Sequence, residues 1–424
     1  MMRRLGLVLL LTFGVPAAVC AQGGWAVRLP APTGPFAVGR VTYHWIDSTR
    51  AEVSSSGPKA RREITLNVWY PALRTIRVTT GAAYIPEFSV IRHAVGDSEL
   101  REVFRPAWPA VLGAGLPVID AIDGAEMPPS ARFPVLLFSH GLEEEGALYS
   151  AELEDLASHG YVVAAIDHPY DAGFAVLSDG RVVPYATAAW SAAEQGGYLP
   201  YVRGRVEVWA ADTRFVLDRL TQYDAKPALA PFAGHLDLAH VGAFGHSMGG
   251  LVSGRVCQSD PRVRACLDQD SDISGSPFAV DRPVTQPFLF IVAQGSNLTR
   301  PATLHPSDQQ LALWKVTRPE YDRELAAAAE RQRAALEQLP AGGWRVTINT
   351  PSFIHRSFSD LPLIAATGDS LLDRDAAHNF RVAQWYTRGF FDRYVKGDST
   401  VKLDDPPPEA KDPNVTVERF GPPN

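Results

Sequence analysis

The feature that most constrains the fold is a series of short apolar runs separated by stretches long enough to form helices. Continuous apolar strands that alternate with helices indicate a parallel sheet with both faces covered. We expect strands at residues 133–138, 161–166, 240–245, 263–268, 287–293 and 344–350. We expect helices near residues 147–159, 205–221, 248–258, 318–338 and 376–396.

Two segments that precede this series have a different pattern. Residues 40–47 and 62–70 alternate apolar and polar side chains, which is typical of half-exposed antiparallel strands. The predicted fold class is therefore α/β, with a mostly parallel central sheet, antiparallel N-terminal strands and helices on both faces. This order of elements is that of an α/β hydrolase.

The N-terminus has the layout of a secretory signal peptide. Residues 1–21 carry Arg3 and Arg4, continue as an apolar run from Leu5 to Val19 and end on Ala21, after which we expect cleavage. The run is shorter than the ~20 residues of a membrane-spanning helix. Cys20 raises the alternative of a lipoprotein, which the bulky Val19 before it disfavours. We expect export to the periplasm or the medium.

One catalytic domain over residues 22–397 is the simplest division of the remaining chain, followed by a Pro-rich tail at 398–424 that we expect to be extended or disordered. Within the domain, residues 82–131, 172–204 and 318–339 look like insertions. The first and the last of them are candidates for a lid over the site.

Charge and cysteine content narrow the function. The chain has 40 basic and 47 acidic residues, and this net charge of −7 argues against nucleic acid as a partner. Cleavage after the signal peptide would leave Cys257 and Cys266, which an oxidising compartment would allow to pair. A disulfide and two separate buried thiols both remain open from the sequence.

The stretch AFGHSMGGL at residues 243–251 is the strongest chemical signal. It reads Gly-x-Ser-x-Gly, and it lies between an apolar strand and the start of a helix. That context is typical of a nucleophile elbow, in which the serine takes a strained conformation and small neighbours let strand and helix pass closely. We therefore predict Ser247 as the nucleophile, rather than a serine in an ordinary glycine-rich turn.

A serine hydroxyl needs a histidine base oriented by a carboxylate, and in this fold the acid and then the histidine follow the serine along the chain. Three histidines follow Ser247: His305, His355 and His378. We predict His355, because it comes directly after the strand 344–350, where a loop can place its imidazole over the elbow.

The acid is expected in the run CLDQDSDISG. We prefer Asp268 to Asp270, because Asp268 stands at the end of a strand and a rigid element is the better platform. The three aspartates 268, 270 and 272 also resemble the start of a calcium loop. However, Ile273 occupies the position where such a loop needs glycine, so we expect neither a metal nor any other cofactor.

An oxyanion hole requires two amide donors. We predict the amide of Met248, which directly follows the nucleophile, and the amide of Leu142 in the loop SHGLEEEG. His140 in that loop is expected to form hydrogen bonds within it. The glutamates 143–145 are expected to favour the N-terminus of the following helix. A sharper alternative is that they attract a cationic headgroup.

Several longer stretches resemble the platelet-activating factor acetylhydrolases of the plasma type and their bacterial relatives. These are FSHGLEEEGALYSAELEDLASHGYVVAAIDH, GHSMGG, LDQDSD and IHRSFSD. The resemblance implies a secreted, calcium-independent esterase with the α/β hydrolase fold. It also implies that Ser247 is the nucleophile, Asp268 the acid and His355 the base, with the amides of Leu142 and Met248 as the oxyanion hole.

Members of that family cleave short or oxidised acyl chains from the middle glycerol position of phospholipids, so a small-molecule or lipid ester is the expected partner. The stretch AWPAVLGAGLPVIDAI at 107–122 could touch lipid aggregates or pack over the pocket. A broad carboxylesterase or cutinase-like polyester hydrolase is the alternative function. A binding protein built on an idle hydrolase fold is a third possibility, disfavoured because all three candidate catalytic residues are present in order.

Overall fold

The structure is a computed structural model. It describes residues 27–52, 60–74, 81–104, 107, 111, 115–186, 198–226, 230–271, 284–293, 307–313, 316–337, 339, 342–366 and 371–420. The expected signal peptide, residues 1–21, lies outside this part of the chain. In the described part, none of the helices combines the length and apolar character needed to cross a membrane.

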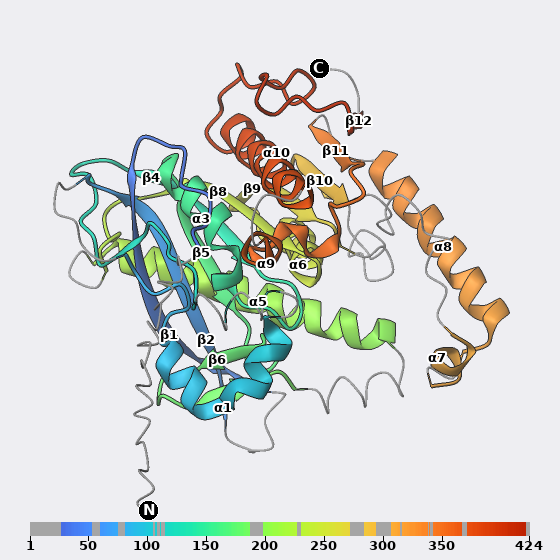
Figure 1. The fold of residues 1–424 in the computed structure, drawn as a ribbon, viewed down its shortest axis with the longest axis horizontal. Coiled ribbons are helices and arrows are strands. Elements are labelled where there is room, and N and C mark those ends of the chain that lie inside the picture. Colours follow the sequence, from blue (N-terminus) through green and yellow to red (C-terminus); the bar gives the residue numbers. More distant parts are fainter. Residues whose placement is uncertain are drawn as a thin grey trace, which may run out of the picture.

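A ten-stranded sheet forms the centre of the molecule (Figure 1). Its strand order is β12-β11-β10-β9-β8-β4-β5-β2-β1-β3. The strands are β1 (Ala37–Ala51), β2 (Arg61–Ala72), β3 (Ile122–Asp123), β4 (Phe133–Ser139), β5 (Val162–Asp167), β8 (Leu236–His246), β9 (Val263–Gln269), β10 (Phe288–Ala293), β11 (Gly343–Ile348) and β12 (Val415–Phe420). A separate hairpin consists of β6 (Phe174–Val176) and β7 (Val182–Pro184).

The strand pairing follows the sequence patterns. Strands β5, β4, β8, β9, β10 and β11 are parallel neighbours, and they are the continuous apolar runs. The two alternating segments became β1 and β2, which pair antiparallel, and β2 joins the parallel part by an antiparallel pairing with β5. The expected α/β hydrolase layout is confirmed.

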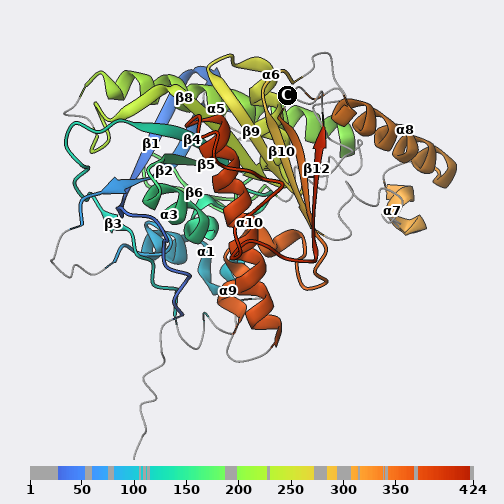
Figure 2. The same cartoon turned by 90° about the horizontal axis from the view of Figure 1, so that it is seen from above.

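Helices cover both faces of the sheet, and Figure 2 shows the two layers from above. The helices are α1 (Phe88–Val103), η1 (Gly146–Tyr149), α3 (Ser150–Ser158), α5 (Tyr198–Asp224), α6 (Met248–Ser259), α7 (Asp308–Leu313), α8 (Arg318–Glu337), η6 (His355–Phe358), α9 (Leu361–Ala365) and α10 (Leu371–Tyr394). Side chains of α1, α3, α9 and α10 share one buried apolar cluster, and side chains of α5 and α6 share another. Alternate residues of β4 supply the two clusters: Leu136 faces the first and Leu137 the second.

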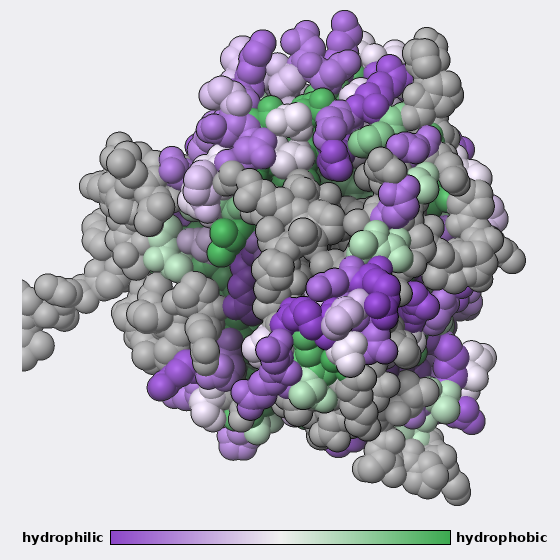
Figure 3. All heavy atoms as spheres, turned by 90° about the vertical axis from the view of Figure 1, so that its right-hand side faces the viewer, coloured by the Kyte–Doolittle hydropathy of each residue, from purple (hydrophilic) through white to green (hydrophobic). Residues whose placement is uncertain are grey.

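The insertions differ in how they pack. Residues 82–131 contain α1 and β3, and Ala107, Ile119 and Ala121 in the apolar stretch 107–122 are buried in the first cluster. The described part of that stretch therefore packs into the core. By contrast, α8 lies at the edge of the molecule, on a face where the described side chains are largely hydrophilic (Figures 1 and 3).

The described part of the tail, residues 398–420, packs against the domain. Leu403 and Ala410 are buried, and β12 pairs antiparallel with β11 along its whole length. The tail has alternating side chains at residues 415–420, a strand pattern that its prolines and charges obscured. The catalytic domain therefore extends to the edge strand β12.

The two remaining cysteines form a disulfide. Cys257 lies in the last turns of α6 and Cys266 lies in β9, and their Cα atoms are 6.3 Å apart. The bridge ties the helix that follows the elbow to the strand beside it.

Candidate active site

The elbow has the predicted geometry. Ser247 lies between β8 and α6 with φ 54° and ψ −118°, a left-handed conformation that is strained for a residue with a side chain. A Cβ atom on Gly249 would lie 1.9 Å from the carbonyl oxygen of Ser139, and one on Gly245 would lie 2.5 Å from the same oxygen. Both glycines are therefore required for strand β4, strand β8 and helix α6 to pass this closely.

The structure brings Ser247 and His355 together. His355 begins the short helix η6 after β11, and its Nε2 atom lies 3.0 Å from Ser247 Oγ. Its Nδ1 atom lies 2.8 Å from Asp270 Oδ2. Ser247 is half-buried and the His355 side chain is 51% exposed, so both groups can be reached from solvent.

The expectation that Asp268 orients the histidine is wrong: the carboxylate that contacts His355 belongs to Asp270. Asp268 is fully buried, and it accepts hydrogen bonds from the amide (2.9 Å) and the hydroxyl of Ser271. Its Oδ1 atom would also lie 2.3 Å from a Cβ atom on Gly250, so it packs against helix α6. Burial raises the pKa of Asp268 to about 7, against the hydrogen bonds from Ser271 that lower it.

The position of Asp270 explains the correction. Strand β9 ends at Gln269, and Asp270 follows with φ 58°. Its Oδ1 atom accepts the amide of Ala293 at the end of β10 (2.9 Å), and its own amide donates to Ile291 (2.9 Å). The carboxylate is therefore held beyond the sheet edge, where the imidazole lies, while Asp268 is still within the sheet.

The two predicted oxyanion donors come from two different segments of the chain. Leu142 belongs to the oxyanion loop, which we define as residues 140–145 between β4 and η1. Met248 is the first residue of α6. Among the described residues, neither the Leu142 amide nor the Met248 amide has a hydrogen-bond acceptor. Both N–H groups are thus available to a substrate oxygen.

A second Ser–His–Asp arrangement lies below this loop. His168 Nε2 is 3.1 Å from Ser139 Oγ, and His168 Nδ1 is 2.8 Å from Asp212 Oδ2. All three residues are buried, Arg62 forms an ion pair with Asp212, and the ring of Trp209 stacks on His168 at 4.0 Å. This arrangement is buried and supports the base of the oxyanion loop, because the His168 amide donates to His140 Nε2 (3.1 Å). The Ser247 arrangement, by contrast, is open to solvent.

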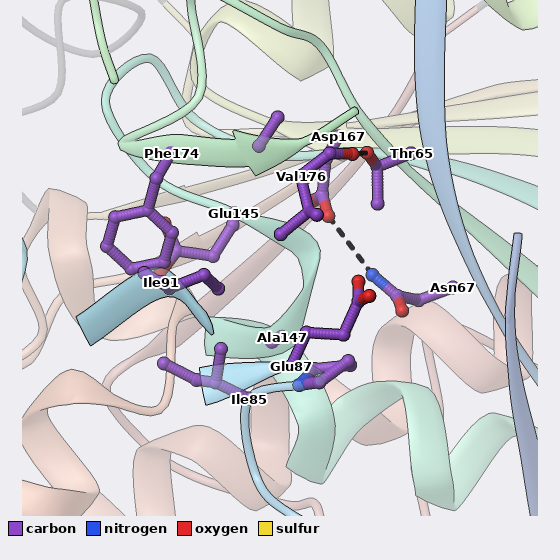
Figure 4. A pocket seen from close by; sticks show the side chains of 12 residues that line it. Thr65, Asn67, Ile85, Glu87, Ile91, Glu145, Ala147, Asp167, Phe174 and Val176 are labelled. Atoms are coloured by element: carbon purple, nitrogen blue, oxygen red, sulfur yellow. Dashed lines mark hydrogen bonds between the residues drawn. The ribbon is translucent and has the colours of Figure 1, made fainter. Parts of the chain in front are cut away.

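A cavity lies on the side of the oxyanion loop that faces α1 and the β6–β7 hairpin (Figure 4). It has an empty volume of about 300 Å³, open solvent included, and its lining contains Glu145 and Asp167. Asp167 accepts the Gly146 amide (2.7 Å) and the Asn67 side chain (3.0 Å). Burial, opposed by these hydrogen bonds, raises the pKa of Asp167 to about 7. Burial also raises the pKa of Glu145 well above its usual value, with a smaller contribution from the Asp167 charge.

The described residues contain no group of three or more His, Cys, Asp or Glu side chains placed to hold a metal ion. Asp272, the third aspartate of the run considered for calcium, lies outside the described residues.

Comparisons with known proteins agree with this geometry. A family model described as platelet-activating factor acetylhydrolase, isoform II, matches residues 22–177. A probable 1-alkyl-2-acetylglycerophosphocholine esterase from Arthroderma benhamiae is 24% identical over 349 residues, which cover 80% of this chain and 78% of that protein. A platelet-activating factor acetylhydrolase from Canis lupus familiaris is 27% identical over 176 residues, which cover 38% of this chain and 40% of that protein.

Among solved structures, a ferulic acid esterase from Streptomyces cinnamoneus matches with a TM-score of 0.66 and 25% sequence identity, covering 93% of this chain and 100% of that one. The relatives share ester hydrolysis, and the fold and the exposed Ser247–His355 pair are those that this chemistry uses. The chain is therefore an ester-hydrolysing serine hydrolase with the α/β hydrolase fold, similar to the platelet-activating factor acetylhydrolases.

Proposed function

We propose that the protein is a secreted esterase that removes short or oxidised acyl chains from phospholipids through an acyl-enzyme on Ser247. The proposed acyl-enzyme chemistry rests on one chain of contacts: Ser247 Oγ lies 3.0 Å from His355, and His355 lies 2.8 Å from Asp270. The similarity to the platelet-activating factor acetylhydrolases supports the substrate class.

In the first half-reaction His355 Nε2 takes the proton of Ser247 as the oxygen attacks the ester carbonyl. Asp270 stabilises the imidazolium that forms, and the amides of Leu142 and Met248 stabilise the oxyanion. The imidazolium then gives its proton to the leaving alcohol. In the second half-reaction His355 activates water, which attacks the acyl-enzyme and regenerates Ser247.

The direct test is Ser247→Ala, assayed with a short p-nitrophenyl ester. We expect turnover to fall to background while the circular dichroism spectrum stays that of the parent protein. A variant that kept most of its activity would disprove the proposed nucleophile. Rates across acyl lengths of phosphatidylcholines then test the substrate class: a steep preference for acetyl over long unoxidised chains is expected.

A broad carboxylesterase is the second candidate, because the similarity to the ferulic acid esterase extends over nearly the whole chain. Simple aryl esters, a feruloyl ester and a polyester should be compared with the phospholipids under the same conditions. Faster hydrolysis of the simple esters than of acetylated phospholipid would favour this second function.

Secretion is supported by the layout of residues 1–21 and by the disulfide, which suits an oxidising compartment. Fractionation of expressing cells, followed by N-terminal sequencing of the mature protein, tests it. A mature chain that begins at Gln22 outside the cytoplasm is expected, and an unprocessed cytoplasmic chain would contradict export.

A further inference from the structure

A buried polar cluster joins the three segments that carry the catalytic groups. The hydroxyl of Tyr149 forms a short hydrogen bond with Glu144 of the oxyanion loop, and it lies 2.7 Å from Nδ1 of His246 in the elbow. The opposite ring nitrogen, His246 Nε2, lies 2.8 Å from the carbonyl oxygen of His355. Glu144, Tyr149 and His246 are all buried.

The contacts of this cluster require a proton beyond those that its neutral tyrosine and histidine supply. The His355 carbonyl can only accept, so His246 Nε2 carries a hydrogen. The Tyr149–His246 and Tyr149–Glu144 contacts need one hydrogen each. Three hydrogens are needed, whereas neutral Tyr149, neutral His246 and ionised Glu144 hold only two. The third belongs either to His246 as imidazolium or to Glu144 as a carboxylic acid.

The surroundings lower the pKa of both partners, so the extra proton follows from the contacts and not from the charges. Burial tends to raise the pKa of Glu144, but the hydrogen bond and charge of His246, with help from Tyr149 and Arg356, lower it to about 2. Burial and the nearby His355 lower the pKa of His246, whereas Glu144 and Asp270 act to raise it. Arg356 approaches Glu144 to 3.8 Å from the far side. The hydrogen-bond count decides in favour of the extra proton.

The cluster also fixes the direction of the Leu142 amide. Tyr149 accepts the Gly141 amide (3.1 Å), and the Gly141 carbonyl accepts the amide of Glu144 (3.1 Å) and Nδ1 of His140 (2.6 Å). In a trans peptide the N–H of Leu142 points opposite to the C=O of Gly141. Holding that carbonyl therefore aims the Leu142 N–H at the other side of the loop, where the oxyanion is expected.

We propose that Glu144, Tyr149 and His246 share one proton and act as positioning residues that lock the oxyanion loop and the histidine segment onto the elbow. This inference rests on the proposed function of Ser247, His355 and Leu142. In this proposal none of the three positioning residues touches the substrate. They act through the Gly141–Leu142 peptide and the His355 backbone.

The test compares Tyr149→Phe, Glu144→Ala and Glu144→Gln with the parent protein and with Tyr161→Phe. Tyr161 is a matched control, because it is buried and donates a hydrogen bond to Asp392 (2.8 Å), away from the site. The folding of each variant is checked first. We then measure kcat and KM on a short p-nitrophenyl ester between about pH 6 and about pH 10, and the affinity of each variant for a trifluoromethyl ketone. That inhibitor adds to the serine and places an oxyanion in the hole.

We expect Tyr149→Phe and Glu144→Ala to lower kcat and inhibitor affinity by about tenfold to a hundredfold, with KM nearly unchanged, because a misaimed donor forfeits part of the oxyanion stabilisation. In Glu144→Gln the amide donates the hydrogen that the cluster needs. This variant should restore most of the activity lost in Glu144→Ala.

Wild-type kcat and inhibitor affinity in Tyr149→Phe and Glu144→Ala would overturn the positioning role, as would an equal loss of kcat in Tyr161→Phe. Activity of Glu144→Gln as low as that of Glu144→Ala would overturn the shared proton. Failure of the proposed function is distinguishable from all of these, because it would appear as residual turnover in Ser247→Ala.

Discussion

Replacing Asp270 by Asn, and Asp268 by Asn in parallel, tests which carboxylate serves His355. Asp270 Oδ2 lies 2.8 Å from His355 Nδ1. At an effective dielectric constant of about 20, a carboxylate this close stabilises a developing imidazolium by about 6 kcal/mol. The His355 side chain is 51% exposed, and solvent screening reduces this figure. We expect Asp270→Asn to lose about 4 kcal/mol of transition-state stabilisation, which corresponds to about a thousandfold lower kcat.

Asp268→Asn should behave differently, because Asp268 contacts Ser271 and helix α6 and not the imidazole. We expect its kcat to stay within about tenfold of the parent value, since only the support of the following loop changes. Both variants are assayed with saturating p-nitrophenyl acetate, and urea unfolding confirms that each is folded. A severe loss in Asp268→Asn together with a mild one in Asp270→Asn would refute the assignment of the acid to Asp270.

Three further predictions concern stability and metal dependence. The pKa of Asp167 is 3.8 in the unfolded chain and about 7 in the folded protein, so between these values the folded protein keeps a proton that the unfolded chain releases. The resulting stabilisation of the folded protein is complete below the unfolded pKa and is lost as pH rises through the folded pKa. In the parent protein this effect lowers the unfolding free energy by up to about 4 kcal/mol from acidic to neutral pH, and in Asp167→Asn this decrease should be absent. Urea unfolding at a series of pH values measures it, and parallel pH profiles for parent and variant would contradict the prediction. Replacing both Cys257 and Cys266 by Ala should lower the unfolding free energy by about 3 kcal/mol, because the disulfide joins residues nine positions apart and restricts the unfolded chain. A variant as stable as the parent would count against this prediction. Chelation with EDTA should leave the esterase rate unchanged, and a loss of about tenfold or more would revive the calcium interpretation.

The order of elements could be predicted from the sequence because it depends on local hydrophobic patterns. Each predicted parallel strand and each predicted helix has a counterpart in the structure, usually shifted by a few residues at its ends. The elbow and His355 could also be predicted from the sequence. Gly245 and Gly249 indicate that strand and helix approach closely at the elbow, and an evident strand precedes His355. These signals lie within short windows of sequence.

The acid and the supporting cluster could not be predicted in this way, because they depend on where strands end in three dimensions. Asp268 and Asp270 differ by only two positions, and only the register of β9 against β10 shows which one passes the sheet edge. The glutamates after Leu142 looked like a charged start of a helix. Glu144 is instead buried against Tyr149 and His246, and His246 lies about a hundred positions further along the chain, a contact that no local pattern contains.

Strand β12 has a practical consequence for anyone who produces this protein. It covers the edge of β11 with a full antiparallel ladder. Removing residues 415–420 would uncover the backbone donors and acceptors of β11, and an exposed strand edge is a template for aggregation between molecules. A purification tag is therefore better joined through a flexible spacer after β12 than put in place of this strand.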